Sequence, residues 1–146
     1  MSVLVDTNVL LRRTQRLYET HIAALQSVAH LLARGEPVYF TPQIIAEFWN
    51  VATRPVANNG LRLSLAEVLA EMEKIEGLLI LLPDVPALYE EWKRLVARHS
   101  VRGVKVHDAR LVAAMNVHGV RRLLTFDPGD FVRYGIEVIQ PASLLL

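Results

Sequence analysis

Short apolar runs alternate with helix-length segments along the chain, and this alternation constrains the fold more than any other feature. Five runs are typical of strands that are covered on both faces, because they are brief and lack polar alternation: Val3 to Val5, Val38 to Phe40, Leu78 to Leu82, Arg122 to Thr125 and Glu137 to Ile139. Helix-length segments lie between them, at about 20 to 34, 43 to 53, 64 to 76, 86 to 98 and 108 to 118. This order predicts an α/β domain with a mainly parallel sheet.

Glycine marks the expected end of three of these helices, at Gly35, Gly77 and Gly119. Glycine adopts the left-handed conformation at little cost, which is why it commonly follows the last turn of a helix. One loop-like stretch, from Arg54 to Arg62, predicts a mobile connection between two helices.

Composition narrows the class of protein further. A chain of 146 residues, 52% of them hydrophobic, predicts one folded domain over residues 1–146 and excludes intrinsic disorder. The absence of cysteine excludes disulfides, thiol nucleophiles and thiolate metal sites. We expect neither a signal peptide nor a membrane span, since every apolar run is far shorter than the roughly 20 residues that cross a bilayer. The expected location is the cytoplasm.

Ligands of open α/β sheets bind beyond the carboxyl ends of the strands. Acidic or polar residues follow three of the predicted strands there: Asp6 to Asn8, Thr41 with Pro42, and Phe126 to Asp130. Each acid also has an ordinary structural explanation.

Asp6 and Asp108 are the acids most clearly placed by the sequence. Either can be an N-cap, because Asp caps helices well and a carboxylate at a helix N-terminus is favoured by the dipole. Asp108, however, shares a helix face with the apolar residues Leu111, Val112 and Met115, where a solvated carboxylate is not expected. For Asp108 we therefore favour a functional role.

The remaining acids are more ambiguous. Glu47 belongs to a polar strip with Gln43, and a solvated helix face is the simpler explanation for that strip. Asp127 and Asp130 lie in an Asp-Pro-Gly segment that is typical of a turn.

Shared location changes this assessment, because these acids are expected at one edge of the sheet. Several carboxylates within a few Å repel one another and require a compensating cation. The five histidines are scattered rather than spaced as ligands, so hard oxygen ligation of Mg²⁺ or Mn²⁺ is what the sequence offers.

The chain resembles PIN domains, and among them the VapC-type toxins of type II toxin-antitoxin pairs. The matching pieces are Val5 to Leu10, Ile45 to Phe48, Val106 to Ala114, and Leu124 to Asp127 with Asp130 and Phe131. Their order and spacing cover nearly the whole chain.

The resemblance implies a three-layer α/β/α fold with about five strands and an endoribonuclease that depends on Mg²⁺ or Mn²⁺. Its acidic quartet would be Asp6, Glu47, Asp108 and Asp127. Similar proteins often carry Asn at the fourth position and another acid a few residues later, so we expect Asp130 to share or replace the role of Asp127 as a metal ligand.

The resemblance also implies supporting positions and partners. Thr7, Asn8 and Thr125 would orient carboxylates or bind the nucleic-acid backbone. The partners would be an RNA substrate, a cognate antitoxin and a second copy of the chain. The helix from His21 to Leu32 and Trp92 are candidates for such interfaces, although core packing is the commoner fate of such residues.

Two other functions stay open. One is a PIN-like domain that binds RNA or a protein without catalysis. The other is a phosphate-transfer domain of the receiver or aspartyl phosphatase kind, which requires a second acid beside Asp6 or two residues after it. Thr7 and Asn8 occupy those positions, which disfavours this class.

The charge balance is compatible with an RNA substrate. The total is +1, from 16 basic and 15 acidic residues; without the four acids of the quartet, 16 basic residues face 11 acidic ones, an excess of +5. Arg12, Arg13 and Lys105 are the candidates for contacts with RNA phosphates.

Overall fold

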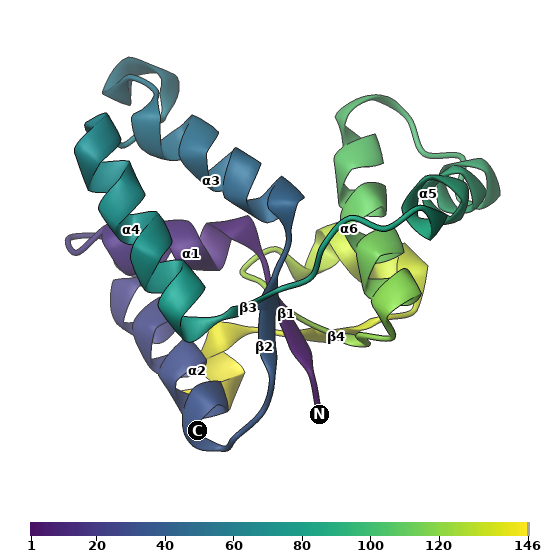
Figure 1. The fold of residues 1–146 in the computed structure, drawn as a ribbon, viewed down its shortest axis with the longest axis horizontal. Helices are drawn as coiled ribbons and strands as arrows, with labels where there is room; N and C mark the ends of the chain where they lie inside the picture. The colour runs from purple at the N-terminus through teal and green to yellow at the C-terminus, as the bar shows by residue number, and fades with distance from the viewer. Residues whose placement is uncertain (146) are drawn as a thin grey trace.

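The computed structural model describes residues 1–145, and in this range it contains five strands, six α-helices and four short 3₁₀ segments (Figure 1). The strands are β1 (Val3–Val5), β2 (Val38–Phe40), β3 (Ile80–Leu81), β4 (Arg122–Leu124) and β5 (Glu137–Ile139). The α-helices are α1 (Thr7–Thr14), α2 (His21–Ala33), α3 (Pro42–Thr53), α4 (Leu65–Leu78), α5 (Ala87–Arg98) and α6 (Val106–His118). The 3₁₀ segments are η1 (Val56–Asn58), η2 (Gly103–Lys105), η3 (Pro128–Tyr134) and η4 (Pro141–Leu145).

All five strands are parallel, in the order β3-β2-β1-β4-β5. The chain builds outward from β1 through β2 to β3 and then returns to place β4 on the other side of β1. The strand order therefore reverses between β1 and β4, and this is the position at which open α/β sheets bind ligands.

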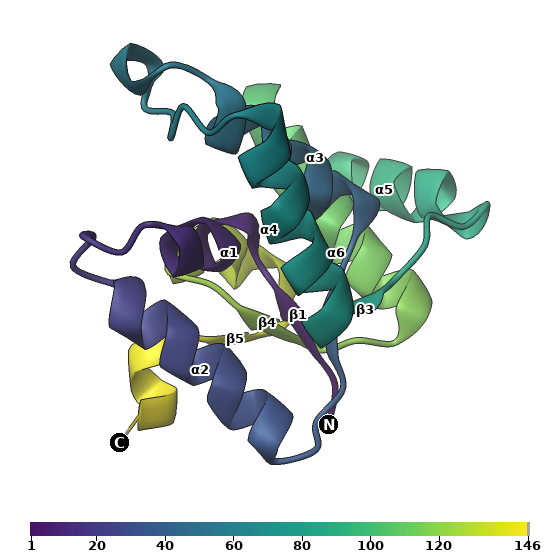
Figure 2. The ribbon, with the colours of Figure 1, turned by 60° about the vertical axis from the view of Figure 1, so that its left-hand side comes forward.

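Helices cover both faces of the sheet, with α1 and α2 on one side and α5 and α6 on the other (Figures 1 and 2). The three residues of β1 are completely buried between these layers. A strand covered on both faces is apolar without alternation, so the predicted three-layer architecture is confirmed.

Two helices begin at the carboxyl edge of the sheet, each with a side-chain cap. Asp6 accepts a hydrogen bond from the Thr7 amide at the start of α1, and Thr41 accepts one from the Ile44 amide at the start of α3. Both caps satisfy amides that a helix leaves unpaired, and they fix the direction in which α1 and α3 leave their strands.

The helices predicted at 20 to 34, 43 to 53 and 86 to 98 agree with α2, α3 and α5 to within one residue at each end. The helix predicted at 108 to 118 begins earlier, so Asp108 lies inside the first turn of α6 and is not its N-cap. Asp6, in contrast, is the N-cap of a helix, α1, as one of its two explanations proposed.

The largest error lies near the third predicted strand. Helix α4 continues past Gly77 to Leu78, and β3 consists of two residues rather than the expected 78 to 82. Gly77 is therefore not a helix stop, whereas Gly119 ends α6 with φ of 71° as expected.

The connection from Arg54 to Arg62 is structured. Backbone hydrogen bonds join Leu61 to Val51 and Leu63 to Ala52, so this connection lies against the last turn of α3. Within residues 1–145, no helix combines the length and the apolar character that a membrane crossing requires.

Candidate active site

Asp6 and Thr125 meet where β1 and β4 end. The Asp6 amide donates to the Leu124 carbonyl at 2.9 Å, which continues the ladder between the two strands. The Thr125 hydroxyl then donates to Asp6 Oδ2 at 2.8 Å, while Oδ1 accepts from the Thr7 amide at 2.8 Å. Each carboxylate oxygen of Asp6 thus has a fixed donor.

The environment of Asp6 disfavours its charged form. Burial raises the pKa of this carboxyl to about 6, and the negative charges of Glu47 and Asp108 act in the same direction. The hydrogen bonds from Thr125 and Thr7 act in the opposite direction but only partly offset burial. A nearby cation would therefore stabilise the charged form of Asp6.

Glu47 projects from α3 toward the same edge of the sheet. Its Oε2 accepts from the Thr7 hydroxyl at 3.1 Å, and its Oε1 accepts from Gln43 Nε2 at 2.8 Å. Glu47 is half-buried, and both of its carboxylate oxygens have a hydrogen-bond partner. A solvated helix face, the simpler explanation from the sequence, does not account for this position.

Asp108 lies opposite, in the first turn of α6. Burial raises the pKa of its carboxyl, and Asp130 and Glu47 add to this effect, while Lys105 and His107 oppose it. Leu111, Val112 and Met115 are buried as expected for the apolar face.

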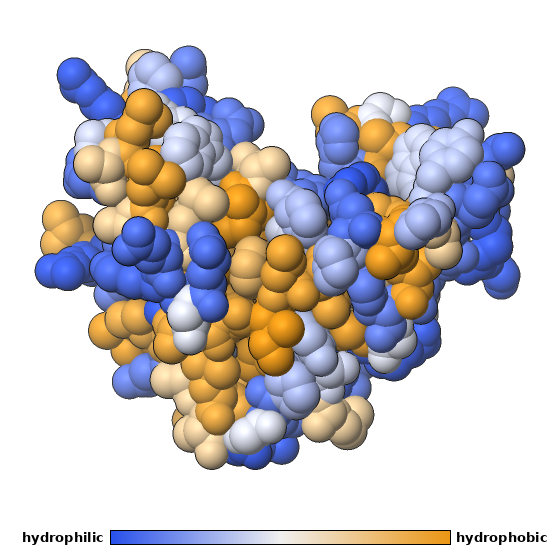
Figure 3. Space-filling model, in the orientation of Figure 1, coloured by the Kyte–Doolittle hydropathy of each residue, from blue (hydrophilic) through white to orange (hydrophobic). Residues whose placement is uncertain are grey.

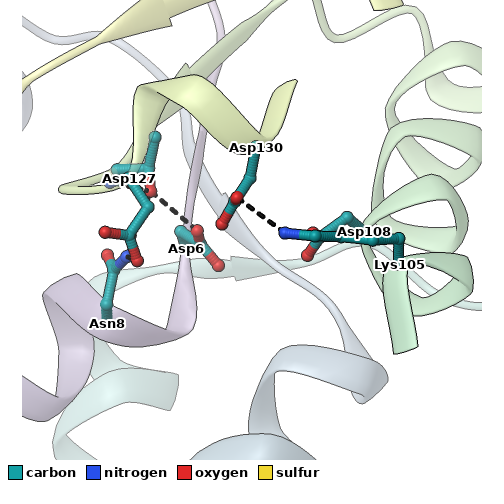
Figure 4. Close-up of polar contacts among 7 residues, drawn as sticks. Asp6, Asn8, Lys105, Asp108, Asp127 and Asp130 are labelled. Carbon is teal, nitrogen blue, oxygen red and sulfur yellow. Dashed lines mark hydrogen bonds and ion pairs between the residues drawn. The ribbon is translucent and has the colours of Figure 1, made fainter. Parts of the chain in front are cut away.

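The two acids after β4 occupy different positions. Asn8 Nδ2 donates to Asp127 Oδ2 at 3.0 Å, and Asp127 is exposed. Asp130 Oδ1 forms an ion pair with Lys105 Nζ at 2.8 Å, and the same ammonium lies 3.8 Å from Asp108 Oδ2. In Figure 4, Asp6, Asp108 and Asp130 point toward a common space, whereas Asp127 is turned toward Asn8. Of the two acids after β4, Asp130 is thus the one that lies beside Asp108.

Thr125 organises the loop that carries these two acids. Its hydroxyl, which donates to Asp6, also accepts from Asn8 Nδ2 and from the Asp127 amide, both at 3.1 Å. Asn8 Oδ1 in turn accepts from the Phe126 amide. Thr7, Asn8 and Thr125, all expected as supporting residues, are thus in contact with the acids.

The basic residues expected to bind RNA are distributed differently. Arg12 donates to Gln15 at 2.6 Å and its guanidinium lies 4.0 Å from the centre of the Tyr18 ring, at the end of α1. Arg13 lines a separate apolar hollow with residues of α2 and Leu78 of α4. Of the three candidates, Lys105 is the one that pairs with the acids.

Two contributors to the site were missed by sequence reasoning. Gln43 Nε2 donates to the His107 carbonyl at 2.8 Å as well as to Glu47, and Arg110 Nη1 donates to Gln43 Oε1 at 2.9 Å. These bonds join α3 to α6 across the site. The spacing of four residues between Gln43 and Glu47 was a signal for their pairing, but the sequence carried none for Arg110.

A cleft of about 690 Å³ lies beside Glu47 and Asp108, between α3 and the start of α6. Figure 3 shows the same face hollowed between the arm of α3 and α4 and the lobe of α5 and α6. An extended ligand can therefore reach the acids from solvent.

The donor set fits a hard divalent cation. The donors are carboxylate oxygens, and burial, together with the neighbouring acids, disfavours the charged forms of Asp6 and Asp108, which a cation would stabilise. Among residues 1–145, however, no three such side chains already surround a single point closely enough to ligate an ion. The Lys105 ammonium lies between two of the acids instead.

A sequence model of the PIN domain family matches residues 3–137. A search of curated proteins found no match.

Solved structures share the fold at low sequence identity. VapC20 of Mycobacterium tuberculosis, described as a sarcin-ricin loop cleaving toxin, has 21% identity and a TM-score of 0.68, over 92% of this chain and 95% of that chain. VapBC2 of Rickettsia felis, bound to a DNA fragment from its promoter, has 12% identity and a TM-score of 0.67, over 96% and 98%. VapBC-1 of nontypeable Haemophilus influenzae has 11% identity and a TM-score of 0.69, over 97% and 99%.

Proposed function

The chain belongs to the PIN domain family, and from this membership and the acidic cluster we propose that it is a metal-dependent endoribonuclease, the toxin of a toxin-antitoxin pair. The observation that carries the proposal is the convergence of Asp6, Glu47 and Asp108 at the switch point between β1 and β4. A largely buried carboxyl whose pKa is raised by burial and, to a lesser extent, by two further acids does not help the protein to fold. It suits a site that binds a divalent cation and a phosphodiester.

Asp6, Glu47, Asp108 and Asp130 are the residues we propose to hold Mg²⁺ or Mn²⁺. Asp130 replaces Asp127 in this set because it shares the Lys105 ammonium with Asp108. When bound, the ion would supply an activated water nucleophile and neutralise charge on the phosphodiester.

The chain's own residues would keep the carboxylates in position for this chemistry. Thr125 and the Thr7 amide fix the orientation of Asp6, while Gln43 and the Thr7 hydroxyl fix that of Glu47. Asn8 binds Asp127 and the loop after β4, so we propose that Asp127 positions this loop and does not ligate the ion. We keep Arg12, which lies near the end of α1, as a proposed contact to RNA phosphates, and we leave out Arg13, which lines the hollow against α2.

The comparisons support the choice of RNA and of partners. VapC20 is described as a toxin that cleaves the sarcin-ricin loop, and other structures with this fold are VapBC complexes. We propose that this chain acts on RNA in the cytoplasm, that a cognate antitoxin inhibits it, and that it forms a homodimer. Exposed apolar residues of α4 and β3 offer area for such contacts, among them Leu69, Ile80 and Leu81.

A PIN-like domain that binds RNA or protein without cleaving it is the second candidate. The observation that favours it is Lys105, which supplies a positive charge between Asp108 and Asp130 without any metal.

Controlled expression in bacteria separates the two candidates. A nuclease toxin arrests growth, and Asp6→Asn and Asp108→Asn both abolish the arrest, while Glu73→Gln at an exposed position of α4 retains it. Growth arrest that persists in both aspartate variants at equal protein levels would overturn the catalytic proposal.

A further inference from the structure

A second hollow adjoins the acidic cleft and has a different chemistry. It has a volume of about 490 Å³ and lies at the start of α5, beside α6. Its lining is Val85, Pro86, Leu88, Tyr89, Trp92 and Arg110. Apart from Arg110, none of these residues contributes to the acidic cleft, and we call this hollow the aromatic pocket.

Arg110 forms the boundary between the two spaces. It lines both the cleft and the aromatic pocket. Its guanidinium is held by Gln43 Oε1 at 2.9 Å and by Asp84 Oδ2 at 3.1 Å, and Gln43 continues the chain of hydrogen bonds to Glu47. A ligand that enters both spaces therefore passes a fixed positive charge.

The aromatic side chains offer faces rather than hydrogen-bond donors. Trp92 Nε1 already donates to the Val106 carbonyl at 2.9 Å, which fixes the indole against the start of α6. The Tyr89 ring lies 6.3 Å from the Trp92 ring, and Tyr89 is 60% exposed. An exposed aromatic ring beside an indole whose N–H is already bonded suits a flat aromatic ligand.

We propose that the aromatic pocket binds one unpaired nucleobase of the RNA, stacked on Tyr89, while Arg110 contacts the phosphate that leads from this base into the acidic cleft. The inference rests on the proposed function, since it takes RNA as the ligand of the cleft. A nucleotide combines a flat ring with an adjoining anion, and this pairing matches the aromatic wall and its guanidinium rim. An apolar peptide would match the wall but would bring Arg110 no anion beyond Asp84, with which it already pairs.

Trp92 fluorescence tests the pocket directly. The chain has two tryptophans, so Trp49→Phe leaves Trp92 as the single reporter, and Asp108→Asn in the same chain prevents consumption of the RNA. Titration with a short unstructured RNA oligonucleotide in Mg²⁺ should quench this fluorescence. Tyr89→Ala should weaken binding about 5- to 150-fold, the range that corresponds to loss of one base-stacking ring. Tyr89→Phe should bind as tightly as the parent, as should Val56→Ala, an exposed apolar control in η1.

Oligonucleotides with one abasic ribose at successive positions identify the bound base. One position should reproduce the loss caused by Tyr89→Ala, and combining that abasic position with Tyr89→Ala should cause little further loss, because both changes remove the same contact. Additive losses from the two changes would overturn the proposal. Undiminished binding of RNA by Tyr89→Ala would also overturn it, as would Trp92 fluorescence that does not change when RNA is added.

Failure of this inference is distinct from failure of the nuclease. If the chain with Asp108 intact cleaves RNA and Tyr89→Ala cleaves equally well at low RNA concentration, the pocket proposal is wrong and the nuclease stands. The opposite result is also possible: the chain does not cleave RNA, yet the abasic position and Tyr89→Ala cause the same, non-additive loss of binding. In that case the pocket proposal stands and the nuclease proposal is wrong.

Discussion

Neutralising Asp6 should stabilise the metal-free protein, and by an amount that depends on pH. Burial raises the pKa of Asp6 from 3.8 to about 6. Between these values the native state holds a proton that the unfolded state has lost, so the free energy of unfolding falls as the pH rises through this window. At about 1.4 kcal/mol per pH unit, the full cost of the ionised carboxylate above pH 6 is about 3 kcal/mol.

Asp6→Asn removes this cost and keeps much of the local structure. Asparagine is also a good N-cap, so the Thr7 amide retains a partner. The quantity to compare is the free energy of unfolding of Asp6→Asn minus that of the parent, both measured in a chelator. We expect this difference to be about 1 to 3 kcal/mol more positive at about pH 7.5 than at about pH 4.5. Effects of the substitution that do not depend on pH cancel when the two pH values are compared.

Urea unfolding curves of both proteins at the two pH values measure the quantity, with Glu73→Gln as a control for loss of an exposed negative charge. Added Mg²⁺ should reduce the advantage of Asp6→Asn at the higher pH, because an ion that binds the native parent stabilises it. A difference between Asp6→Asn and the parent that is the same at both pH values would refute the reasoning.

Two further predictions concern the ammonium in the site and the glycines. Lys105→Met should tighten Mn²⁺ binding roughly threefold, since it removes a positive charge that pairs with two of the proposed ligands. Titration calorimetry measures this affinity, with Lys93→Met as the control. Unchanged affinity would exclude competition between Lys105 and the ion. Gly60→Ala should lower the free energy of unfolding by about 1 to 3 kcal/mol, because the new Cβ would lie 1.9 Å from the Arg54 carbonyl oxygen. Gly77→Ala should raise the free energy of unfolding by about 0.5 to 1 kcal/mol, because Gly77 lies inside α4 with open space around it. Equal effects of the two substitutions on thermal unfolding would contradict this account.

Most of the fold could be predicted because local sequence and tertiary environment agree. The apolar run from Val3 to Val5 has no polar alternation, and this strand is buried on both faces. The exception near Leu78 has a physical reason. A short apolar run fits a helix end as well as a strand, and α4 tolerates Gly77, so only tertiary packing decides where the helix ends.

The site could be predicted as far as the chain direction determines it. Asp6 follows β1 and Asp108 begins a helix, so both positions follow from the topology. Which carboxylate of the loop after β4 approaches Asp108 depends on the path of η3, which a turn motif does not specify. The bond between Gln43 and Arg110 joins residues 67 positions apart and has no local signature.

The central claim is that the acidic cluster hydrolyses RNA with a metal-activated water, and the ends of the products test it most directly. We expect the purified chain to cleave RNA in Mg²⁺ or Mn²⁺, to lose this activity in a chelator, and to leave 5′-phosphate and 3′-hydroxyl ends, because no side chain or ribose hydroxyl acts as the nucleophile. Asp108→Asn should slow cleavage by more than about 100-fold. Products with 2′,3′-cyclic phosphate ends, or cleavage that persists in the chelator, would contradict the account.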